Sequence, residues 1–195
     1  MSVNVDPATT ALLVMDFQGG MLRDAPDADT LVKTVSALVG RAREKSVQVG
    51  FVRVGFSDAD YDALPAHSRF AAIAANETMR SAMHADAPTT AIDERIAPQE
   101  IDIVVRKTRV GPFTSTDLHE QLRSRGIDTL VLAGLTTAGV VLSTVRQAAD
   151  MDYRTIVLSD GCADPDPQVH ETLMEKVFPR QAEVVTVDSL LSALS

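Results

Sequence analysis

Short apolar runs alternate with segments of helical periodicity along most of this 195-residue chain, and this alternation constrains the fold more than any other feature. Buried strands are predicted at Ala11–Phe17, Val47–Val54, Ile101–Val105, Thr129–Ala133, Thr155–Leu158 and Glu183–Thr186. Helices are predicted at residues 29–45, Thr116–Arg125, 139–151, Pro167–Phe178 and the C-terminal end. The region from Ser57 to Pro98 favours a loop excursion with one or two short helices.

Strands that alternate with helices predict a single α/β domain over residues 1–195, with three α/β/α layers and a six-stranded, mostly parallel sheet. Right-handed crossovers favour the strand order 3-2-1-4-5-6. In such a sheet ligands bind beyond the carboxyl ends of the strands, where the strand order reverses. Asp16 and the segment 134–140 are therefore expected to face each other across that point.

The composition narrows the range of partners. A net charge of −9 disfavours nucleic acid and anionic membranes. No apolar run approaches the roughly 20 residues that span a bilayer, and the N-terminus does not resemble a signal peptide. One cysteine excludes a disulfide framework and a cysteine-based metal cage. We therefore expect a cytoplasmic protein that acts on a small molecule.

A nucleotide-binding enzyme is the main alternative for this fold class. The first strand–helix turn reads Asp16-Phe17-Gln18-Gly19-Gly20, without the glycine spacing of a dinucleotide site or the lysine and hydroxyl of a triphosphate site. Gly19-Gly20 is more typical of a tight turn. A dinucleotide oxidoreductase is accordingly disfavoured, and no cofactor is predicted.

Two charged residues at strand ends are candidates for catalysis. Asp16 ends an apolar strand, where an unpaired carboxylate is costly, so it is expected to pair with a cation or hold a proton. A structural carboxylate that caps the next turn is an equal alternative. Lys107 follows the third strand about two strand spacings, roughly 10 Å, from Asp16. A solvated lysine is the alternative there, since Arg106 and Arg109 lie beside it.

Three stretches in this order resemble the signature regions of the isochorismatase-like (cysteine) hydrolases: ALLVMDFQ, VVRKTRVGPFTSTDL and GLTTAGVVLSTVRQAAD. The stretch DGCADPDPQVHETL adds to the resemblance, which extends to about Val185. That family includes nicotinamidases, carbamoylsarcosine amidases and isochorismatases. The resemblance implies the same three-layer fold, a hydrolase activity on a small organic substrate, and a homodimer or higher homo-oligomer.

The resemblance also assigns roles to residues. Asp16 matches the family's general base and Lys107 the lysine that stabilises negative charge. Gly134 and Thr137 fit the third motif, but Val140 stands at the position of the catalytic cysteine. A non-proline cis peptide is implied at Leu135–Thr136, with backbone N–H groups of the following loop facing a substrate oxygen.

Val140 changes the expected chemistry, because an isopropyl group cannot act as the nucleophile of a covalent amidase. Isochorismatases also lack this cysteine: their aspartate protonates a vinyl carbon and water attacks the resulting cation. Asp16 and Lys107 are sufficient for hydrolysis of that kind. Cys162, in a predicted turn after the fifth strand, is an alternative nucleophile, although a lone buried cysteine usually serves packing.

The remaining site predictions concern binding. The predicted substrate-binding or oxyanion-loop residues are Gln18, Arg53, Phe113, Thr136, Thr137 and Val140. Arg53 is the candidate for an anionic substrate group, with a surface cation as the alternative. No metal site is predicted, because the four histidines are scattered along the chain. A catalytically silent protein that binds a metabolite or acts as an assembly partner remains the alternative to a hydrolase.

Overall fold

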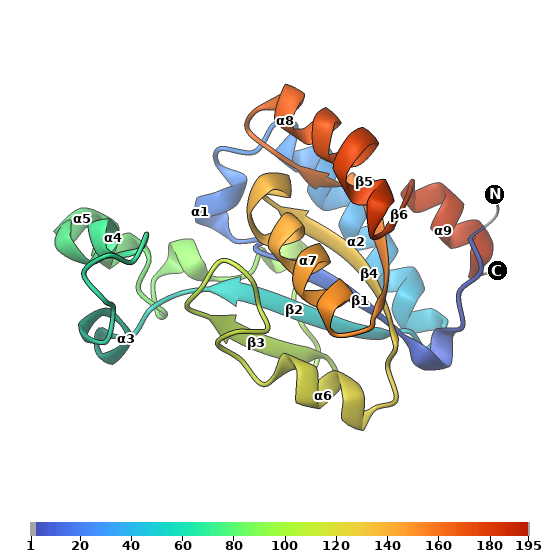
Figure 1. Ribbon diagram of the computed structural model, residues 1–195, viewed down its shortest axis with the longest axis horizontal. Coiled ribbons are helices and arrows are strands. Elements are labelled where there is room, and N and C mark those ends of the chain that lie inside the picture. The colour runs from blue at the N-terminus through green and yellow to red at the C-terminus, as the bar shows by residue number, and fades with distance from the viewer. Residues whose placement is uncertain (1–2, 195) are drawn as a thin grey trace.

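The computed structural model describes residues 3–194, and its strands form one six-stranded parallel sheet (Figure 1). The strand order β3-β2-β1-β4-β5-β6 is the predicted one. The strands are β1 (Thr10–Met15), β2 (Gln48–Val54), β3 (Ile103–Lys107), β4 (Thr129–Leu135), β5 (Arg154–Ala163) and β6 (Glu183–Val185). The order reverses between β1 and β4, which lie at the centre of the sheet and pair directly.

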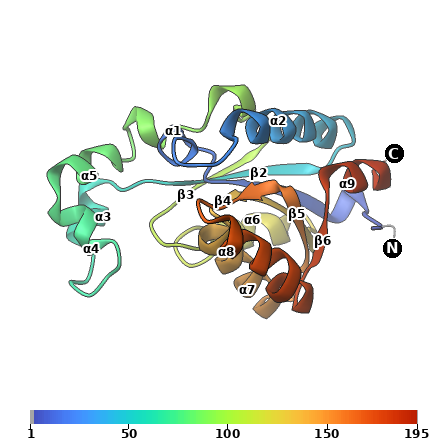
Figure 2. The same cartoon turned by 90° about the horizontal axis from the view of Figure 1, so that it is seen from above.

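Helices cover both faces of the sheet, as the view from above shows (Figure 2). One face carries α2 and α9, and the other carries α6, α7 and α8. The longer helical elements are α2 (Ala28–Glu44), α6 (Leu118–Ser124), α7 (Leu142–Asp150), α8 (Pro167–Thr172) and α9 (Val187–Ala193). Shorter ones near the strand ends are α1 (Gly19–Leu22), the π-helical turns η4 (Thr137–Val141) and η5 (Leu173–Val177), and the 3-10 turns η1 (Pro7–Thr9) and η6 (Phe178–Arg180).

The apolar core is divided by the sheet into two layers. Alternate residues of β1 contribute to each layer: Leu12 and Val14 pack beneath α2, whereas Leu13 and Met15 pack against the helices of the opposite face. Because both faces are covered, β1 reads as a continuous apolar run rather than an alternating one.

The excursion between β2 and β3 forms a small cluster of its own at the left of Figure 1. It contains three short helices, more than expected, and two 3-10 turns: α3 (Asp58–Asp62), α4 (Ala71–Ala75), α5 (Glu77–Ala82), η2 (Pro88–Thr90) and η3 (Glu94–Ile96). Phe56 is fully buried there and stacks on Tyr61, with ring centroids 5.1 Å apart. Phe70, directly before α4, also packs against the Phe56 ring, with ring centroids 5.4 Å apart. These aromatic contacts attach the excursion to the end of β2.

Several strand boundaries differ from the predictions: β1 ends at Met15 instead of Phe17, and β4 continues to Leu135 instead of ending at Ala133. β3 lies two residues later than predicted, because Ile101 is 75% exposed while Lys107 is the last residue of the strand. β5 continues to Ala163 instead of ending at Leu158. A hydrogen bond from another segment of the same chain supports a polar residue of this extension: Asp160 accepts it from the Val187 N–H at 2.8 Å. Cys162 therefore lies inside a strand and not in the predicted turn.

Within residues 3–194 no helix is long and apolar enough to cross a membrane.

A substitution in the apolar stripe of helix α2 tests how much the core contributes to the free energy of unfolding. Leu38 is fully buried in its apolar stripe, so we expect Leu38→Ala to lower the free energy of unfolding by about 2–5 kcal/mol. Urea unfolding followed by circular dichroism measures this. Lys33→Ala on the exposed face of the same helix is the matched control and should change stability by less than about 0.5 kcal/mol. Equal effects of the two substitutions would contradict this description of the core.

Candidate active site

The carboxyl ends of three strands meet at the point where the strand order reverses. Asp16 follows β1, Lys107 ends β3, and Thr136 follows β4. Asp16 has a φ of 60°, a left-handed conformation that aspartate tolerates better than most residues. Its N–H donates to the Val52 carbonyl at 2.8 Å, and its carbonyl accepts from the Gln18 N–H at 2.8 Å. These bonds hold the turn that carries the carboxylate.

Asp16 and Lys107 form a buried ion pair. The Lys107 Nζ lies 2.9 Å from the Asp16 Oδ2, and both side chains are 4% exposed. The lysine also donates to the Arg109 carbonyl at 3.3 Å. The second carboxylate oxygen of Asp16, Oδ1, is buried and has no hydrogen-bond partner within residues 3–194. One oxygen is thus held by the lysine, while the other has no partner among the described residues.

Burial raises the pKa of Asp16 from 3.8 to about 6. Desolvation of the carboxylate is the main cause, and Lys107 acts in the opposite direction through its charge and its hydrogen bond. A carboxyl group with a pKa near 6 is partly protonated at neutral pH. It can therefore donate a proton or accept one, which an exposed aspartate does poorly at that pH.

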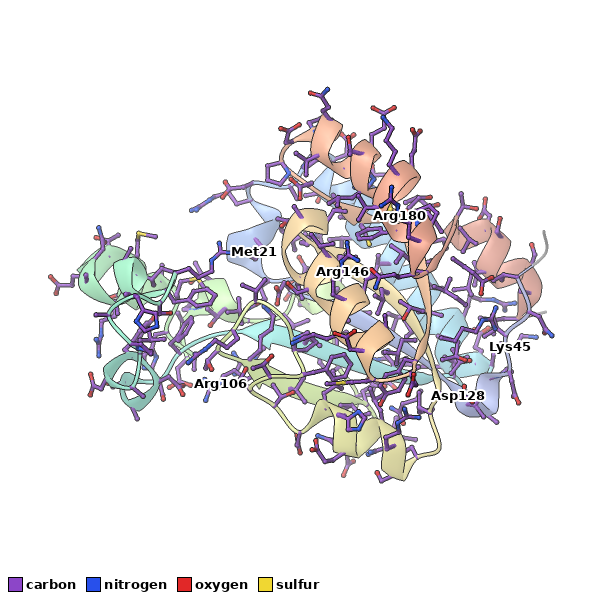
Figure 3. The ribbon with its side chains drawn as sticks, viewed as in Figure 1. Met21, Lys45, Arg106, Asp128, Arg146 and Arg180 are labelled. Carbon is purple, nitrogen blue, oxygen red and sulfur yellow. The ribbon has the colours of Figure 1, made fainter. Side chains whose placement is uncertain are left out.

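The ion pair lines a cavity of about 260 Å³. Its walls are mostly apolar and come from two sources. The core contributes Val54, Leu135, Thr136 and Val140, and the excursion contributes Phe70, Ile73 and Met83. Met21 of α1 also lines the cavity and is labelled in Figure 3. A small, largely apolar space with one buried charge pair is typical of a small-molecule site.

The segment after β4 forms one wall. A cis peptide joins Leu135 to Thr136, at the position that the sequence resemblance implies. Two loop N–H groups are already occupied: that of Ala138 donates to the Asp164 carboxylate at 2.8 Å, and that of Gly139 to the Thr136 carbonyl at 3.1 Å. Val140 is 2% exposed and presents an alkyl side chain to the cavity. The wall beside Asp16 is therefore apolar at this position.

Gln18 and Arg53 do not line the cavity. The Gln18 amide is buried and bridges two segments, because its Nε2 donates to the carbonyls of Val54 and Thr90 and its Oε1 accepts from the Val54 N–H. Arg53 donates to the Ala85 carbonyl at 2.8 Å. Both side chains attach the excursion to the sheet, so their visible contacts are structural.

Phe113 and Thr137 also lie outside the cavity. Phe113 is buried in the core layer that also contains residues of α6 and α7, and it stacks on Tyr153 with ring centroids 6.0 Å apart. Thr137 is fully buried, and its hydroxyl forms a 2.8 Å hydrogen bond with the His170 Nδ1. That bond fastens the loop after β4 to helix α8. Of the six residues predicted for binding, Thr136 and Val140 are the two that line the cavity.

Cys162 does not line the cavity. It lies in β5 opposite Gly134, is 4% exposed, and directs its Sγ to the Leu132 carbonyl at 3.6 Å. Burial raises the pKa of its thiol to about 12. A thiol of this kind is protonated at neutral pH and is a poor nucleophile.

Of the cavity residues from the excursion, Ile73 and Met83 were missed by the sequence reasoning, whereas Phe70 is one of the phenylalanines that the sequence suggests for the pocket, with core packing as the alternative. Phe70, Ile73 and Met83 lie in short segments whose position depends on contacts with Phe56 and Tyr61. In the described part of the chain no group of three or more histidine, cysteine, aspartate or glutamate residues is arranged to hold a metal ion.

Comparison with known proteins agrees with this geometry. Residues 10–189 match the isochorismatase domain. The chain belongs to the isochorismatase family. An uncharacterized isochorismatase family protein from Escherichia coli is 32% identical over 202 residues, covering 98% of this chain and 100% of that protein. An isochorismatase family protein from Burkholderia thailandensis has a similar structure, with a TM-score of 0.84, 28% identity, and coverage of 98% of this chain and 97% of the other.

The family contains hydrolases. A ureidoacrylate amidohydrolase from Methylobacterium radiotolerans is 29% identical to this isochorismatase-family chain over 215 residues, covering 99% of the chain and 83% of the relative. At the family level the protein is thus similar to hydrolases of small molecules. The described cavity is of a size that suits such substrates.

The buried pair can be tested by a double-mutant cycle at pH 8. We expect Asp16→Asn and Lys107→Met each to lower the free energy of unfolding by about 3–5 kcal/mol, because each leaves one buried group without its partner. The double substitution should cost clearly less than the sum. Asparagine suits position 16 because it also tolerates a positive φ. Additive costs in urea unfolding would contradict a coupled pair.

The reactivity of Cys162 provides a second test. In the native protein we expect no alkylation of this thiol by iodoacetamide at pH 8, because it is buried and its pKa is high. Mass spectrometry after a timed reaction measures it. Asp150→Cys, which places a second thiol at an exposed position of α7, is the positive control and should be alkylated once. Rapid modification of Cys162 in the folded wild type would contradict the structure.

Proposed function

We propose that the protein hydrolyses a small organic substrate by acid–base catalysis through Asp16 and Lys107, without a covalent intermediate. The observation that carries this proposal is the buried pair itself, in which Asp16 Oδ1 is left without a partner on the wall of the cavity. An unsatisfied buried carboxylate oxygen is costly in a protein that does not use it.

The side chains around the pair support a non-covalent route. Val140, at the position that the resemblance gives to a cysteine nucleophile, offers an alkyl group. Cys162 lies in the core with a raised pKa. The hydroxyls of Thr137 and Thr144 are bonded to His170 and to the Val140 carbonyl. Water is therefore the nucleophile that we assign to the reaction.

The proposed step uses protonated Asp16 as the acid. Its proton passes to the substrate, whose electron pair forms the new bond to hydrogen and leaves an electron-deficient carbon. Water adds to that carbon and returns one proton to the Asp16 carboxylate. The other proton of the water passes to the leaving group as the bond between that group and the carbon breaks. One water is consumed, one substrate bond is broken, and Asp16 regains its proton.

Lys107 has two tasks in this scheme. Its ammonium stabilises the Asp16 carboxylate that forms when the proton leaves, at 2.9 Å from Oδ2. It also keeps the carboxyl pKa from rising further in the apolar cavity. Burial alone would make Asp16 too weak an acid, and an exposed aspartate would be ionised at neutral pH.

The activities of relatives support the hydrolase class but not a particular substrate. The name of the Methylobacterium relative assigns it an amidohydrolase activity, and a maleamate amidohydrolase from Pseudomonas putida is a further relative. A catalytically silent protein that binds a metabolite in the same cavity is the alternative function. The test below separates the two.

A screen of small amides, esters and enol ethers with wild type and Asp16→Asn tests the proposal. We expect Asp16→Asn to lower kcat at least about 100-fold, because it removes the acid. Wild-type kcat/KM should fall about tenfold per pH unit as pH rises above about 6, since Asp16 must be protonated to act.

Asp150→Asn, at an exposed position on α7, is the matched control and should retain wild-type activity. Hydrolysis that survives Asp16→Asn would contradict the proposed function. A rate that increases as pH rises through about 6 would contradict the acid step and indicate a base instead. Ligand binding without turnover of any compound would support the silent alternative.

A further inference from the structure

A second depression adjoins the catalytic cavity. This groove has a volume of about 820 Å³ and lies between the loop after β3, helix α7 and the turn η5. Three residues line both spaces: Arg69, Phe70 and Val110. The groove therefore lies directly beside the cavity that holds Asp16.

The groove is cationic although the chain carries a net charge of −9. Arg69, Arg109 and Arg146 line it, and no aspartate or glutamate does so. Figure 3 labels Arg146 on α7. Some arginines elsewhere pair with carboxylates, as Arg106 does with Asp60 at 2.7 Å, whereas Arg53 and Arg125 donate to backbone carbonyls. Within residues 3–194 none of the three groove arginines forms an ion pair.

Neutral contacts orient these guanidinium groups without cancelling their charge. Arg109 donates to the Thr108 carbonyl at 2.7 Å, and Arg146 donates to the Gln181 side chain. Arg69 lies over the Phe70 ring, 5.5 Å from its centroid. A guanidinium has five N–H donors, and these bonds use a minority of them. The remaining donors suit a carboxylate or a phosphate.

The rest of the groove is largely apolar. Phe70, Val110, Leu142, Leu173 and Val177 contribute to its surface. The ligand that matches both features has an apolar body and a negatively charged end. A protein partner is less well matched, because the adjoining cavity at Asp16, of about 260 Å³, is too small for a folded surface to enter.

We propose that the groove binds the anionic end of the substrate, with Arg69, Arg109 and Arg146 as its cations. The substrate is then an organic anion, whose reactive group lies beside Asp16 and whose charged end lies over α7. This inference rests on the proposed function for the reaction, but it concerns binding. It also moves the anion site from Arg53, which bonds to the Ala85 carbonyl instead.

Matched pairs of ligands test the charge preference. The probes are benzoate, phenylacetate, 3-phenylpropionate and 4-phenylbutyrate, each compared with its primary amide by calorimetry on Asp16→Asn, in which turnover is removed. We expect at least one carboxylate to bind at least about tenfold more tightly than its amide. The difference should shrink as NaCl rises from about 0.05 to 0.5 M, because salt screens exposed charges.

Substitutions locate the site. Arg109→Gln and Arg146→Gln should each weaken carboxylate binding about three- to tenfold and leave amide binding unchanged. Arg125→Gln is the matched control: Arg125 also donates to a backbone carbonyl, but it lies at the C-terminal end of α6 and lines a different depression. It should change neither affinity.

Several results would overturn the inference. One is that no carboxylate binds more tightly than its amide, and another is that the arginine variants weaken both ligands equally. A third is that Arg146→Gln loses anion binding only because an oligomer dissociates, which sedimentation of each variant measures. In that case the groove contacts a second copy of the chain and not the substrate. Anion binding without any hydrolysis would support the anion site in the groove and contradict only the proposed function.

Discussion

Two opposite charges lie side by side at the end of the sheet, and the properties of the site depend on their burial. Two strand spacings, about 10 Å, separate the strands that carry Asp16 and Lys107. The long lysine stem crosses the end of β2 and closes the gap to 2.9 Å. Desolvation raises the pKa of Asp16 and the lysine lowers it, and the balance lies near 6. The apolar walls and the ion pair therefore act together, because neither alone gives a carboxyl group with a pKa close to neutral pH.

Much of the fold was predictable because apolar periodicity and crossover handedness act on long segments. The six strands, their order and the α2 stripe follow from these rules. The errors occurred where polar side chains lie inside strands. Arg106 belongs to β3 because it bonds to the Gly55 carbonyl and Asp60, and Asp160 belongs to β5 because it accepts the Val187 N–H. Such partners come from distant segments and leave no local signal.

The candidate site was predictable in its position but only partly in its members. A strand end that faces the reversal of strand order locates Asp16, Thr136 and Val140. It does not determine whether a neighbouring side chain enters the cavity or fastens a loop, and Gln18 does the latter. The walls from the excursion depend on aromatic packing around Phe56. That packing brings together residues that have no common periodicity.

Net charge is a poor guide to the local field, and the groove beside the cavity shows why. The excess of acidic residues disfavours polyanions such as nucleic acid, yet the three groove arginines have no carboxylate beside them. The proposed anion and the proposed acid are physically compatible. A negative charge bound near Asp16 disfavours its ionised form, so substrate binding would raise the pKa of the carboxyl group further. An anionic substrate would thus help to keep Asp16 protonated, as the acid step requires. The arginines would offset the cost of desolvating the substrate's negative charge.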